Sequence, residues 1–567
     1  MKRFGLQWPM WSIVLMSSPA LAGIPADLLL DNGKIVTIDS KSSIASAVVI
    51  KDGKILAVGG PEIAKRYTAS KVIDLKGRML LPGFTDAHVH IQAMPGRAID
   101  MAGLKSIADL QNRLRAKAKE LGPGKWITGS GWDEALFSEK RNPSKVDLDA
   151  ATPSNPVVLT RAGGHSAVGN SMAIKIAGID RNTPDPEFGV IEKDSSGEPN
   201  GVIREANSLY YKHVPREKWE ALRPSYIKSI KALLPLGITS FHSASTSIDD
   251  EPVGKGGIAD PGSGLTFSRL KSIYKEMGSD LPRVTTYISY PGPQRLKAFP
   301  MRSGDGDIQV RLGGIGETSV DGGFTGPAAW TLVDYKGMPG YRGKGRFTNT
   351  ELQAIVDDSA RNGWQMALHA IGDAAIVQTV NAYTKALNSI QGPGRQGKDR
   401  RWFLDHFTIM PPEETMRTMA RDGIMIAQQP NFLYNLEGRY EATLDDWRLA
   451  HNNSVATPRK LGVFVAFSSD NLPIGPVVGL YAAIMRKGPS GRVHGADEAV
   501  TRMDAIRMYT LNPAYLSWEE KIKGSLEPGK LADMIVVDHD LLTVSEEEIL
   551  STHVDMTFVG GKLVYHR

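Results

Sequence analysis

The sequence contains no cysteine among its 567 residues. This absence excludes disulfide bonds, thiolate metal ligands and a lipid-modified cysteine anchor. The chain also lacks an apolar run of the roughly 20 residues that a membrane-spanning helix needs. It has no lysine- and arginine-rich tract and a net charge of only +5. Without a basic strip interleaved with aromatic residues, we expect neither nucleic acid nor a membrane span among its partners.

The composition that remains is that of an ordinary globular enzyme. Apolar residues make up 41% of the chain and charged residues 23%, which suffices for a sizeable core. The length exceeds that of one average domain, so we expect one large domain with appendages. Neither composition nor length fixes the oligomeric state, and a homodimer is compatible with both.

The first 22 residues have the pattern of a secretory signal peptide. Lys2 and Arg3 precede a short apolar stretch at 11–16, and Ala20-Leu21-Ala22 offers small residues at a cleavage position. We expect cleavage after Ala22 and a periplasmic or secreted protein. The alternative is an N-terminus that is disordered or docked on the domain.

Both ends of the remaining chain are rich in short β-strands. Between residues 27 and 54, apolar runs alternate with Asn-Gly and Asp-Gly turns, which is typical of hairpins. Residues 532–537 and 556–565 repeat the pattern around a Gly-Gly turn. We therefore predict a small β-sandwich domain built from both termini, residues 23–78 and 521–567.

The middle of the chain, 79–520, alternates short apolar strands with amphipathic helices, as α/β proteins do around a parallel sheet. Eight is the number of strands that a (β/α)8, or TIM, barrel requires, and the candidates are 79–81, 238–242, 284–288, 309–313, 365–369, 402–406, 425–428 and 463–468. The interval of about 101–236 is too long for one crossover and predicts an inserted subdomain. Residues 245–264 are expected to form a mobile loop or lid, and Thr350 with Gln353 a capping box.

The sharpest chemical signal is the pair His88 and His90. In an extended segment, residues two apart point to the same side, so both rings can bind one ion at the end of a strand. Barrel active sites lie at that end. The alternative is two surface histidines, but the pair follows an apolar strand and a Pro-Gly turn.

A metal site needs further ligands, and three later strands end on suitable side chains. His369, His406 and Asp470 each close an apolar run. Any one of them alone is more often a buried, hydrogen-bonded polar residue, but chance explains the set poorly. Imidazole and carboxylate without thiolate suit a divalent metal, zinc first, with manganese or iron as alternatives.

With these residues in place, the chain resembles the amidohydrolase superfamily. Within it, the chain is similar to the subgroup that contains N-substituted formamide deformylase and related metal-dependent hydrolases. The resemblance covers essentially the whole chain after residue 22. Its motifs are the His-x-His strand, Gly131-Trp132-Asp133, Arg161-Ala162-Gly163-Gly164-His165, Gly201-Val202-Ile203-Arg204-Glu205, Ser468-Ser469-Asp470 and the segment 524–533.

One departure from the family concerns the bridging ligand. Many members carry a carboxylated lysine that joins two metals, in this subgroup four residues before an Asp-Gly. Glu317 stands at that place, before Asp321-Gly322. A glutamate is chemically close to a carboxylated lysine, so we predict that Glu317 bridges two ions. The alternative is that Glu317 pairs with a cation and the site holds one metal.

The resemblance also implies a mechanism. His88 and His90 would hold one ion and His369 and His406 the other, so that bound water ionises near neutral pH. Asp470 would act as general base and then protonate the leaving nitrogen. With one ion only, His406 becomes a candidate for polarising the substrate carbonyl. The expected reaction is hydrolysis of the C–N bond of a small-molecule N-substituted amide or formamide, outside peptide bonds.

Weaker candidates surround this set. We predict substrate contacts for residues that match subgroup motifs or end barrel strands: Trp132, Asp133, His165, His242, Asp321, Gln428 and Asn431. For the first three the alternative is a role in supporting the fold, and for His242 it is a place in the core. Asp321 could instead orient Glu317. Glu205 matches a motif too, but its place in the insertion makes it a poorer ligand candidate than Glu317.

Two other functions are compatible with parts of this pattern. A deaminase of a heterocyclic or amidine-like substrate would use a single metal, so metal content separates it from the amidase. A non-catalytic exported binding protein would have no physical reason to keep every ligand. Fold alone does not choose among them.

Overall fold

The computed structural model describes residues 23–251, 264–324 and 326–567. The predicted signal peptide, 1–22, lies outside the described residues, and so does most of the predicted loop at 245–264. Export therefore stays a prediction. Over the described ranges, no helix is both long enough and apolar enough to cross a membrane.

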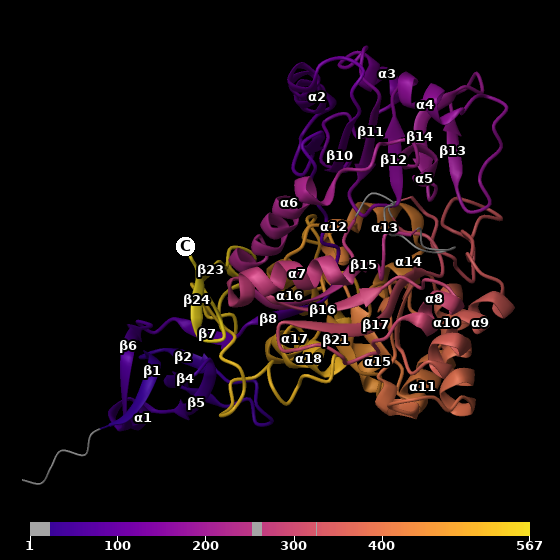
Figure 1. Ribbon diagram of the computed structural model, residues 1–567. Coiled ribbons are helices and arrows are strands. Elements are labelled where there is room, and N and C mark those ends of the chain that lie inside the picture. The colour runs from indigo at the N-terminus through magenta and orange to yellow at the C-terminus, as the bar shows by residue number, and fades with distance from the viewer. Residues whose placement is uncertain (1–22, 252–263, 325) are drawn as a thin grey trace, which may run out of the picture.

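The centre of the molecule is a parallel sheet of eight strands in the order β21-β20-β19-β18-β17-β16-β15-β8 (Figure 1). Its strands are β8 (Phe84–Val89), β15 (Ile238–Thr246), β16 (Arg283–Ile288), β17 (Val310–Ser319), β18 (Gln365–Ala370), β19 (Phe403–His406), β20 (Met425–Gln428) and β21 (Val465–Phe467). The chain after β21 returns to β8, where the Asp470 N–H donates to the His88 carbonyl at 2.9 Å. The sheet is thus a nearly closed TIM barrel, as predicted.

Helices cover the outside of this sheet, which explains why its strands are buried on both faces. Every residue of β16 and β18 is buried. The surrounding helices are α6 (Trp219–Lys231), α7 (Phe267–Met277), α8 (Pro293–Ala298), α9 (Asn349–Arg361), α10 (Asp373–Ser389), α11 (Glu413–Asp422), α12 (Asn431–Asn435), α13 (Glu437–Thr443), α14 (Asp446–Ala450), α15 (Ala456–Lys460), α16 (Pro476–Met485), α17 (Arg502–Met508) and α18 (Leu511–Leu516).

The predicted capping box before α9 is displaced by two residues. Thr348 is the N-cap, and its hydroxyl accepts from the Glu351 N–H at 3.2 Å. The Glu351 carboxylate accepts in return from the Thr348 N–H at 2.8 Å. The prediction of Thr350 with Gln353 is therefore wrong, because Thr348 and Glu351 offer the same spacing and a carboxylate in place of an amide.

The predicted first barrel strand, 79–81, belongs elsewhere. These residues lie in β7 (Met79–Pro82), which pairs with β2 (Lys34–Val36) and β22 (Met534–Val537). The barrel begins one residue beyond Gly83, which lies so close to Thr239 that an added Cβ would meet its side chain at 2.1 Å. Both β7 and β8 are fully buried, so hydrophobicity could not separate them.

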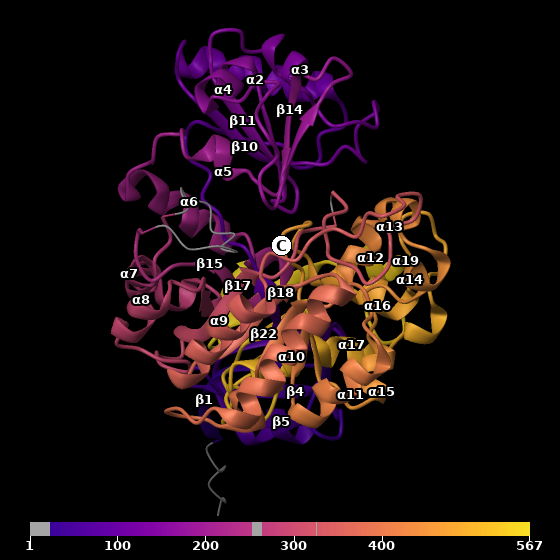
Figure 2. The same ribbon diagram turned by 90° about the vertical axis from the view of Figure 1, so that its right-hand side faces the viewer.

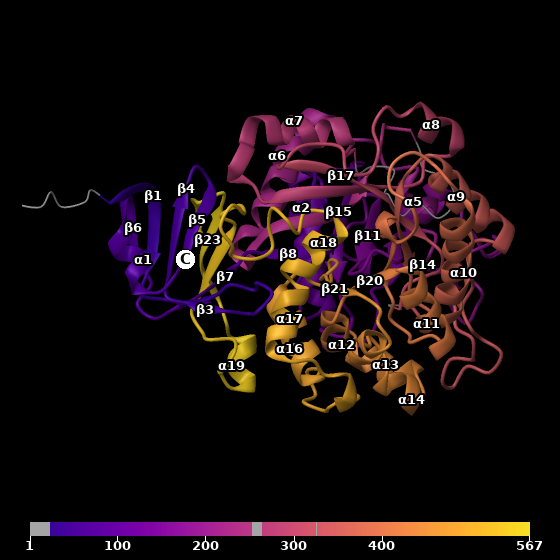
Figure 3. The ribbon, with the colours of Figure 1, turned by 90° about the horizontal axis from the view of Figure 1, so that it is seen from below.

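Strands from the two ends of the chain lie side by side, at the left of Figures 1 and 3. One sheet has the order β24-β23-β22-β7-β2-β3 and the other β5-β4-β1-β6. Their remaining members are β1 (Ile24–Asp31), β3 (Ile44–Ala45), β4 (Ala47–Lys51), β5 (Lys54–Gly59), β6 (Tyr67–Asp74), β23 (Val554–Val559) and β24 (Lys562–His566), with α1 (Pro61–Arg66) and α19 (Glu546–Leu550) beside them. Leu28 and Ile50 share one apolar cluster with Met534 and Phe558. That these sheets form a separate β-sandwich domain stays a prediction.

The insertion between β8 and β15 has a sheet of its own, in the order β13-β14-β12-β11-β10-β9. Figure 2 shows it at the top, across one end of the barrel. Its strands are β9 (Ala98–Asp100), β10 (Ile127–Trp132), β11 (Val157–Arg161), β12 (Ser166–Gly169), β13 (Val190–Lys193) and β14 (Pro199–Arg204), and its helices are α2 (Ile107–Leu121), α3 (Lys145–Asp149), α4 (Ser171–Ala177) and α5 (Ser208–Tyr211). Leu110, Ile127 and Leu159 belong to a core distinct from that of the barrel.

Candidate metal centre

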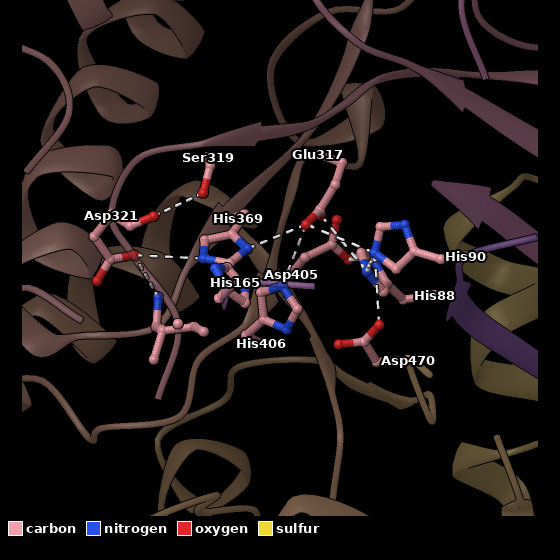
Figure 4. Close-up of polar contacts among 12 residues, drawn as sticks. His88, His90, His165, Glu317, Ser319, Asp321, His369, Asp405, His406 and Asp470 are labelled. Atoms are coloured by element: carbon pink, nitrogen blue, oxygen red, sulfur yellow. Dashed lines mark hydrogen bonds and ion pairs between the residues drawn. The ribbon is translucent and has the colours of Figure 1, made fainter. Parts of the chain in front are cut away.

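The residues predicted as ligands meet at the carboxyl ends of the barrel strands (Figure 4). His88 lies in β8, with His90 just beyond its end; Glu317 lies in β17, His369 in β18, and His406 ends β19. Asp470 follows β21 by three residues. Segments far apart in sequence meet here because parallel strands all end at one rim of a barrel.

Glu317 lies at the centre of this group. Its Oε1 is 3.1 Å from His369 Nδ1 and 3.8 Å from His406 Nε2. Its Oε2 is 3.5 Å from His88 Nε2, and His90 Nε2 lies 3.8 Å from Oε1. Two sets of three possible ligands therefore share Glu317: His88 and His90 complete one, and His369 and His406 the other.

Asp470 lies at the edge of the group, next to the first histidine pair. Its Oδ1 is 3.5 Å from His90 Nε2. The nearby Nε2 atoms of His88 and His90 face each other at 3.2 Å. This places a carboxylate beside one of the two ligand sets, opposite the His369 side of Glu317 (Figure 4).

The backbone at these residues is unusual. Glu317, His406 and Asp470 have positive φ angles of 51°, 80° and 59°. Left-handed backbone costs residues other than glycine about 1–3 kcal/mol each. Such conformations persist where the surrounding structure imposes them and are concentrated at functional sites.

Two neighbouring residues fix the orientation of the histidine rings. His88 Nδ1 lies 3.2 Å from Asp405 Oδ1, and His406 Nδ1 lies 2.9 Å from Gln429 Oε1. The Gln429 amide nitrogen donates to Ser468 Oγ at 2.9 Å, so its oxygen must accept from His406 Nδ1–H. Asp405 and Gln429 thus hold a proton on Nδ1 of each ring, which leaves Nε2 as the atom that would bind a metal in place of any proton it carries.

The sequence predictions missed these two orienting residues. Asp405 precedes His406, and strand alternation assigns neighbours to opposite faces. The left-handed φ at His406 interrupts that alternation. Gln429 follows the predicted Gln428, and a polar Gln-Gln pair after a buried strand was the available signal.

The electrostatics of the group favour a bound cation. Burial alone would lower the pKa of His88, but the carboxylates of Asp405 and Glu317 raise it to about 10. Burial lowers the pKa of His369 to about 3, and His406 adds to the effect. The pKa of Glu317 stays well below its usual value because adjacent imidazoles outweigh its burial. Glu317 is therefore a buried anion.

Buried atoms without partners support the same conclusion. Over the described residues, Glu317 Oε2, His406 Nε2 and Asp470 Oδ1 have no hydrogen-bond partner. Buried polar atoms are paired in nine cases of ten or more, so these three mark a missing group. Nitrogen and carboxylate oxygen donors suit zinc and similar divalent ions. The residues present therefore fit a divalent metal.

His165 reaches the centre from the insertion. Its ring centroid lies 5.7 Å from that of His369, and its Nδ1 lies 3.1 Å from Glu205 Oε2. Glu205 also accepts from the Gly323 N–H at 3.0 Å and pairs with Arg346. Burial raises the pKa of Glu205, but His165 and Arg346 lower it to about 2. Glu205 thus anchors His165 and is no member of the two ligand sets.

Other predicted substrate contacts do not reach the centre. Trp132 is 0% exposed within the core of the insertion, so its subgroup motif reflects packing, and the prediction is corrected. Asp133 pairs with Arg161 at 3.3 Å and accepts from the Ala135 N–H at 3.0 Å. It holds a loop of the insertion.

The two amides that follow the seventh strand differ in how their polar atoms are paired. Gln428 is fully buried, and its amide donates to the Phe407 carbonyl at 2.9 Å and accepts from the Gln429 N–H at 2.8 Å, which corrects the prediction that Gln428 contacts substrate. Asn431 donates to the Ser469 carbonyl at 2.8 Å, but its Oδ1 has no hydrogen-bond partner over the described residues. A substrate contact therefore stays a prediction for Asn431.

Asp321 lies behind His369, as Figure 4 shows. Its carboxylate accepts backbone N–H groups of Trp330 (2.8 Å), Ile371 (3.0 Å) and Gly372 (2.8 Å), and Oδ1 lies 3.7 Å from His369 Nε2. Burial raises the pKa of Asp321 to about 7 despite these bonds. The geometry favours a role in positioning the loop and His369 over a substrate contact.

His242 is 1% exposed inside the barrel. Burial and the nearby Lys523 lower its pKa to about 3, so the ring is neutral. Its centroid lies 5.5 Å from that of Tyr287. Both of its ring nitrogens lack a hydrogen-bond partner over the described residues, so a substrate contact stays a prediction for His242, with the core role as its alternative.

A nearly closed (β/α)8 barrel with histidines and carboxylates at its strand ends is the arrangement of metal-dependent barrel hydrolases. The model of the amidohydrolase family matches residues 71–565. The chain therefore belongs to the amidohydrolase family, and the resemblance inferred from its motifs is confirmed.

Similar proteins have been characterised to different extents. N-substituted formamide deformylase of Arthrobacter pascens is 27% identical over 563 residues, covering 95% of this chain and 98% of the relative. The putative amidohydrolase YtcJ of Bacillus subtilis is 27% identical over 548 residues, covering 94% and 98%. An uncharacterised metal-dependent hydrolase from Pyrococcus horikoshii has a TM-score of 0.69 at 24% identity, covering 92% and 99%, which supports the fold.

Proposed function

We propose that the protein hydrolyses the C–N bond of an N-substituted amide or formamide, with two zinc ions held by its strand-end residues. One observation carries the proposal: the two ligand sets share the carboxylate of Glu317. The name of the deformylase relative supports the substrate class. Without shared ligands, two neighbouring ions of like charge would repel each other with nothing between them.

The proposed residue roles follow from their positions. His88 and His90 would hold one ion and His369 and His406 the other, and Glu317 would be shared by both sets. When bound, divalent ions lower the pKa of water toward about 7 and polarise a carbonyl. Asp470 has an oxygen without a hydrogen-bond partner over the described residues, and it accepts the proton of the attacking water. The same carboxyl then gives that proton to the leaving nitrogen as the C–N bond breaks.

We further propose that His165 contacts the substrate. Its Nδ1 is engaged by Glu205, which leaves Nε2 as the polar atom that can meet the substrate. Gly323 allows this approach, because a Cβ there would lie 2.4 Å from the His165 ring. The insertion thus completes a site whose remaining residues all come from the barrel.

The test combines metal content with turnover. We expect two equivalents of zinc per chain in the wild-type protein and hydrolysis of some members of a panel of N-formyl and N-acyl amines. Glu317→Gln should lower the content to one equivalent or less and abolish turnover. The control Glu62→Gln changes an exposed glutamate in α1 and should leave both unchanged.

The result also separates the amidase from the alternative deaminase. A wild-type protein with one firmly bound ion, unaltered by Glu317→Gln, would contradict the shared ligand and favour deamination. Release of ammonia from heterocyclic amines, with no amide cleaved, would point the same way.

A further inference from the structure

A cavity lies at the opposite end of the barrel from the metal centre. Its volume is about 80 Å³, and it lies against Arg302, Gln365, Arg395, Arg400 and Trp518. Gln365 begins β18, the strand that carries His369. Four residues of strand span about 13 Å at roughly 3.3 Å each, so this cavity is separate from the catalytic end.

Three arginines converge on the cavity without a carboxylate partner among the described residues. Arg302 donates to the Met301 carbonyl at 2.7 Å. Arg400 donates to the Ala360 carbonyl at 2.9 Å and to Gln396 Oε1 at 3.0 Å. The Arg395 guanidinium lies over the Trp518 ring, 4.2 Å from its centroid. Each contact is with a neutral group, so the positive charges are not balanced.

Arg400 is the most telling of the three. Arg400 is only 3% exposed, and its Nε has no hydrogen-bond partner within the described part of the chain. A buried guanidinium nitrogen is normally paired, since leaving a buried donor unpaired costs about 1–3 kcal/mol, and more when the group is charged. A missing acceptor is the simplest account.

The surroundings add positive charge. Glu520 is already bonded to both terminal nitrogens of Arg401, at 3.0 Å and 2.9 Å. Burial lowers the pKa of Arg395, and the charges of Arg401 and Arg311 lower it further, outweighing the carboxylates of Asp399 and Glu520, which raise it. A site in which positive charges repel one another attracts an anion.

One neutral donor completes the cavity. Ser303 Oγ accepts from the Gln365 N–H at 2.8 Å, so its own proton remains available. Together with the arginine nitrogens it offers donors from three segments: 302–303, 395 and 400. Planar guanidinium groups match the paired oxygens of carboxylates and phosphates.

We propose that this cavity is a binding site for a small oxyanion, a carboxylate or phosphate group, on the face of the barrel opposite the metals. The inference is independent of the proposed hydrolase activity, since it uses no residue of the metal centre. The occupant is a soluble metabolite or an inorganic ion that bears such a group.

Calorimetric titration of the zinc-loaded protein tests the proposal, with inorganic phosphate and benzoate as probes at constant ionic strength. We expect saturable binding of one probe molecule per chain, and the tighter probe identifies which oxyanion the cavity prefers. Arg395→Ala and Arg302→Ala should each weaken binding about tenfold or more, the size of effect for one charge-assisted contact. Arg395 is exposed, so its variant should keep the wild-type melting temperature, and Ser303→Ala gives a second, uncharged variant.

Two controls separate the cavity from other anion sites. Arg115→Ala removes an equal charge from α2, where Arg115 contacts Asn112 at 3.0 Å, and should leave the affinity unchanged. Glu317→Gln reports on anions held by the metals. Binding lost in Glu317→Gln but kept in Arg395→Ala would overturn the proposal. So would binding equally weakened by Arg115→Ala, or no saturable binding of either probe.

Discussion

The two ends of the barrel both bury charged residues, yet they treat them differently. At the carboxyl ends of the strands, Glu317 Oε2, His406 Nε2 and Asp470 Oδ1 have no hydrogen-bond partner over the described residues. At the amino ends, the Glu519 carboxylate lies 2.7 Å from Lys523 Nζ and accepts from Ser517 Oγ at 2.8 Å and Thr285 Oγ1 at 3.2 Å.

The amino-end network also joins the barrel to the C-terminal strands. Arg283 forms two bonds with Asp533, at 2.7 Å and 3.0 Å, and Lys523 donates to Ser240 Oγ at 2.6 Å. Charges arranged in closed pairs stabilise one packing of the chain. The unpaired atoms at the carboxyl ends instead lie where the proposed metals would bind. Buried charges thus serve stability in the Glu519 network, whereas the same residue types at the carboxyl ends serve the proposed chemistry.

The largest effect should come from Asp470. If its carboxylate moves the proton, Asp470→Asn should lower kcat by about 10²- to 10⁴-fold, the usual contribution of a general acid–base group. Zinc content should stay near the wild-type value, because the amide keeps an oxygen at this position. Steady-state kinetics on the most active amide, with metal analysis of the same samples, gives both numbers.

The matched control for this variant is Asp422→Asn. Asp422 is a buried aspartate that pairs with Arg421 at the end of α11, far from the strand ends that carry the metals. It should leave kcat within a factor of two of wild type. Unchanged kcat in Asp470→Asn would remove Asp470 from the proposed mechanism.

The next effect concerns stability, and it tests the contrast between the two ends directly. Glu519→Gln leaves the buried Lys523 without its ionic partner and should lower the free energy of unfolding by about 3–5 kcal/mol. Burial raises the pKa of Glu519, but Lys523 and Arg311 lower it to about 2, so Glu519 is ionised at neutral pH. Denaturant unfolding of the zinc-free protein measures the loss.

Two further variants sharpen this measurement. Replacing both partners, as Glu519→Leu with Lys523→Met, should cost less than the single change, because no unpaired charge remains. Glu317→Gln should destabilise the zinc-free protein less than Glu519→Gln does. Equal losses of unfolding free energy in Glu317→Gln and Glu519→Gln would contradict the contrast between the two ends.

The barrel was predictable from sequence because its strands and helices repeat a regular pattern. Seven of the eight candidate strands overlap observed barrel strands, and the predicted ligands His88, His90, Glu317, His369, His406 and Asp470 do lie together. The exception, 79–81, failed because buried strands of two different sheets follow each other with only Gly83 between them.

The residues around the ligands were harder to predict. Local patterns gave no indication that Asp405 faces His88 across two strands, nor that Trp132 is buried inside the insertion. A motif shared with relatives records that a residue matters, but packing and catalysis leave the same trace in a sequence. In the structure, a packing role and a catalytic role are distinguished by whether each polar atom has a hydrogen-bond partner.

The smallest effect, on metal affinity, should come from the ring-orienting residue Gln429. Gln429→Leu removes the acceptor that keeps the proton on His406 Nδ1, so Nε2 loses its preference for the lone-pair form. Changes to such residues commonly weaken metal binding by about 10- to 100-fold. Competition with a chelator of known affinity measures the change at the site that contains His406.

Gln429→Glu keeps an acceptor and should restore most of the affinity. Gln378→Met, a buried glutamine that donates to the Phe347 carbonyl at 2.9 Å, should reduce stability without changing zinc binding. Equal zinc affinities in Gln429→Leu and the wild type would contradict the role of Gln429 in orienting the His406 ring.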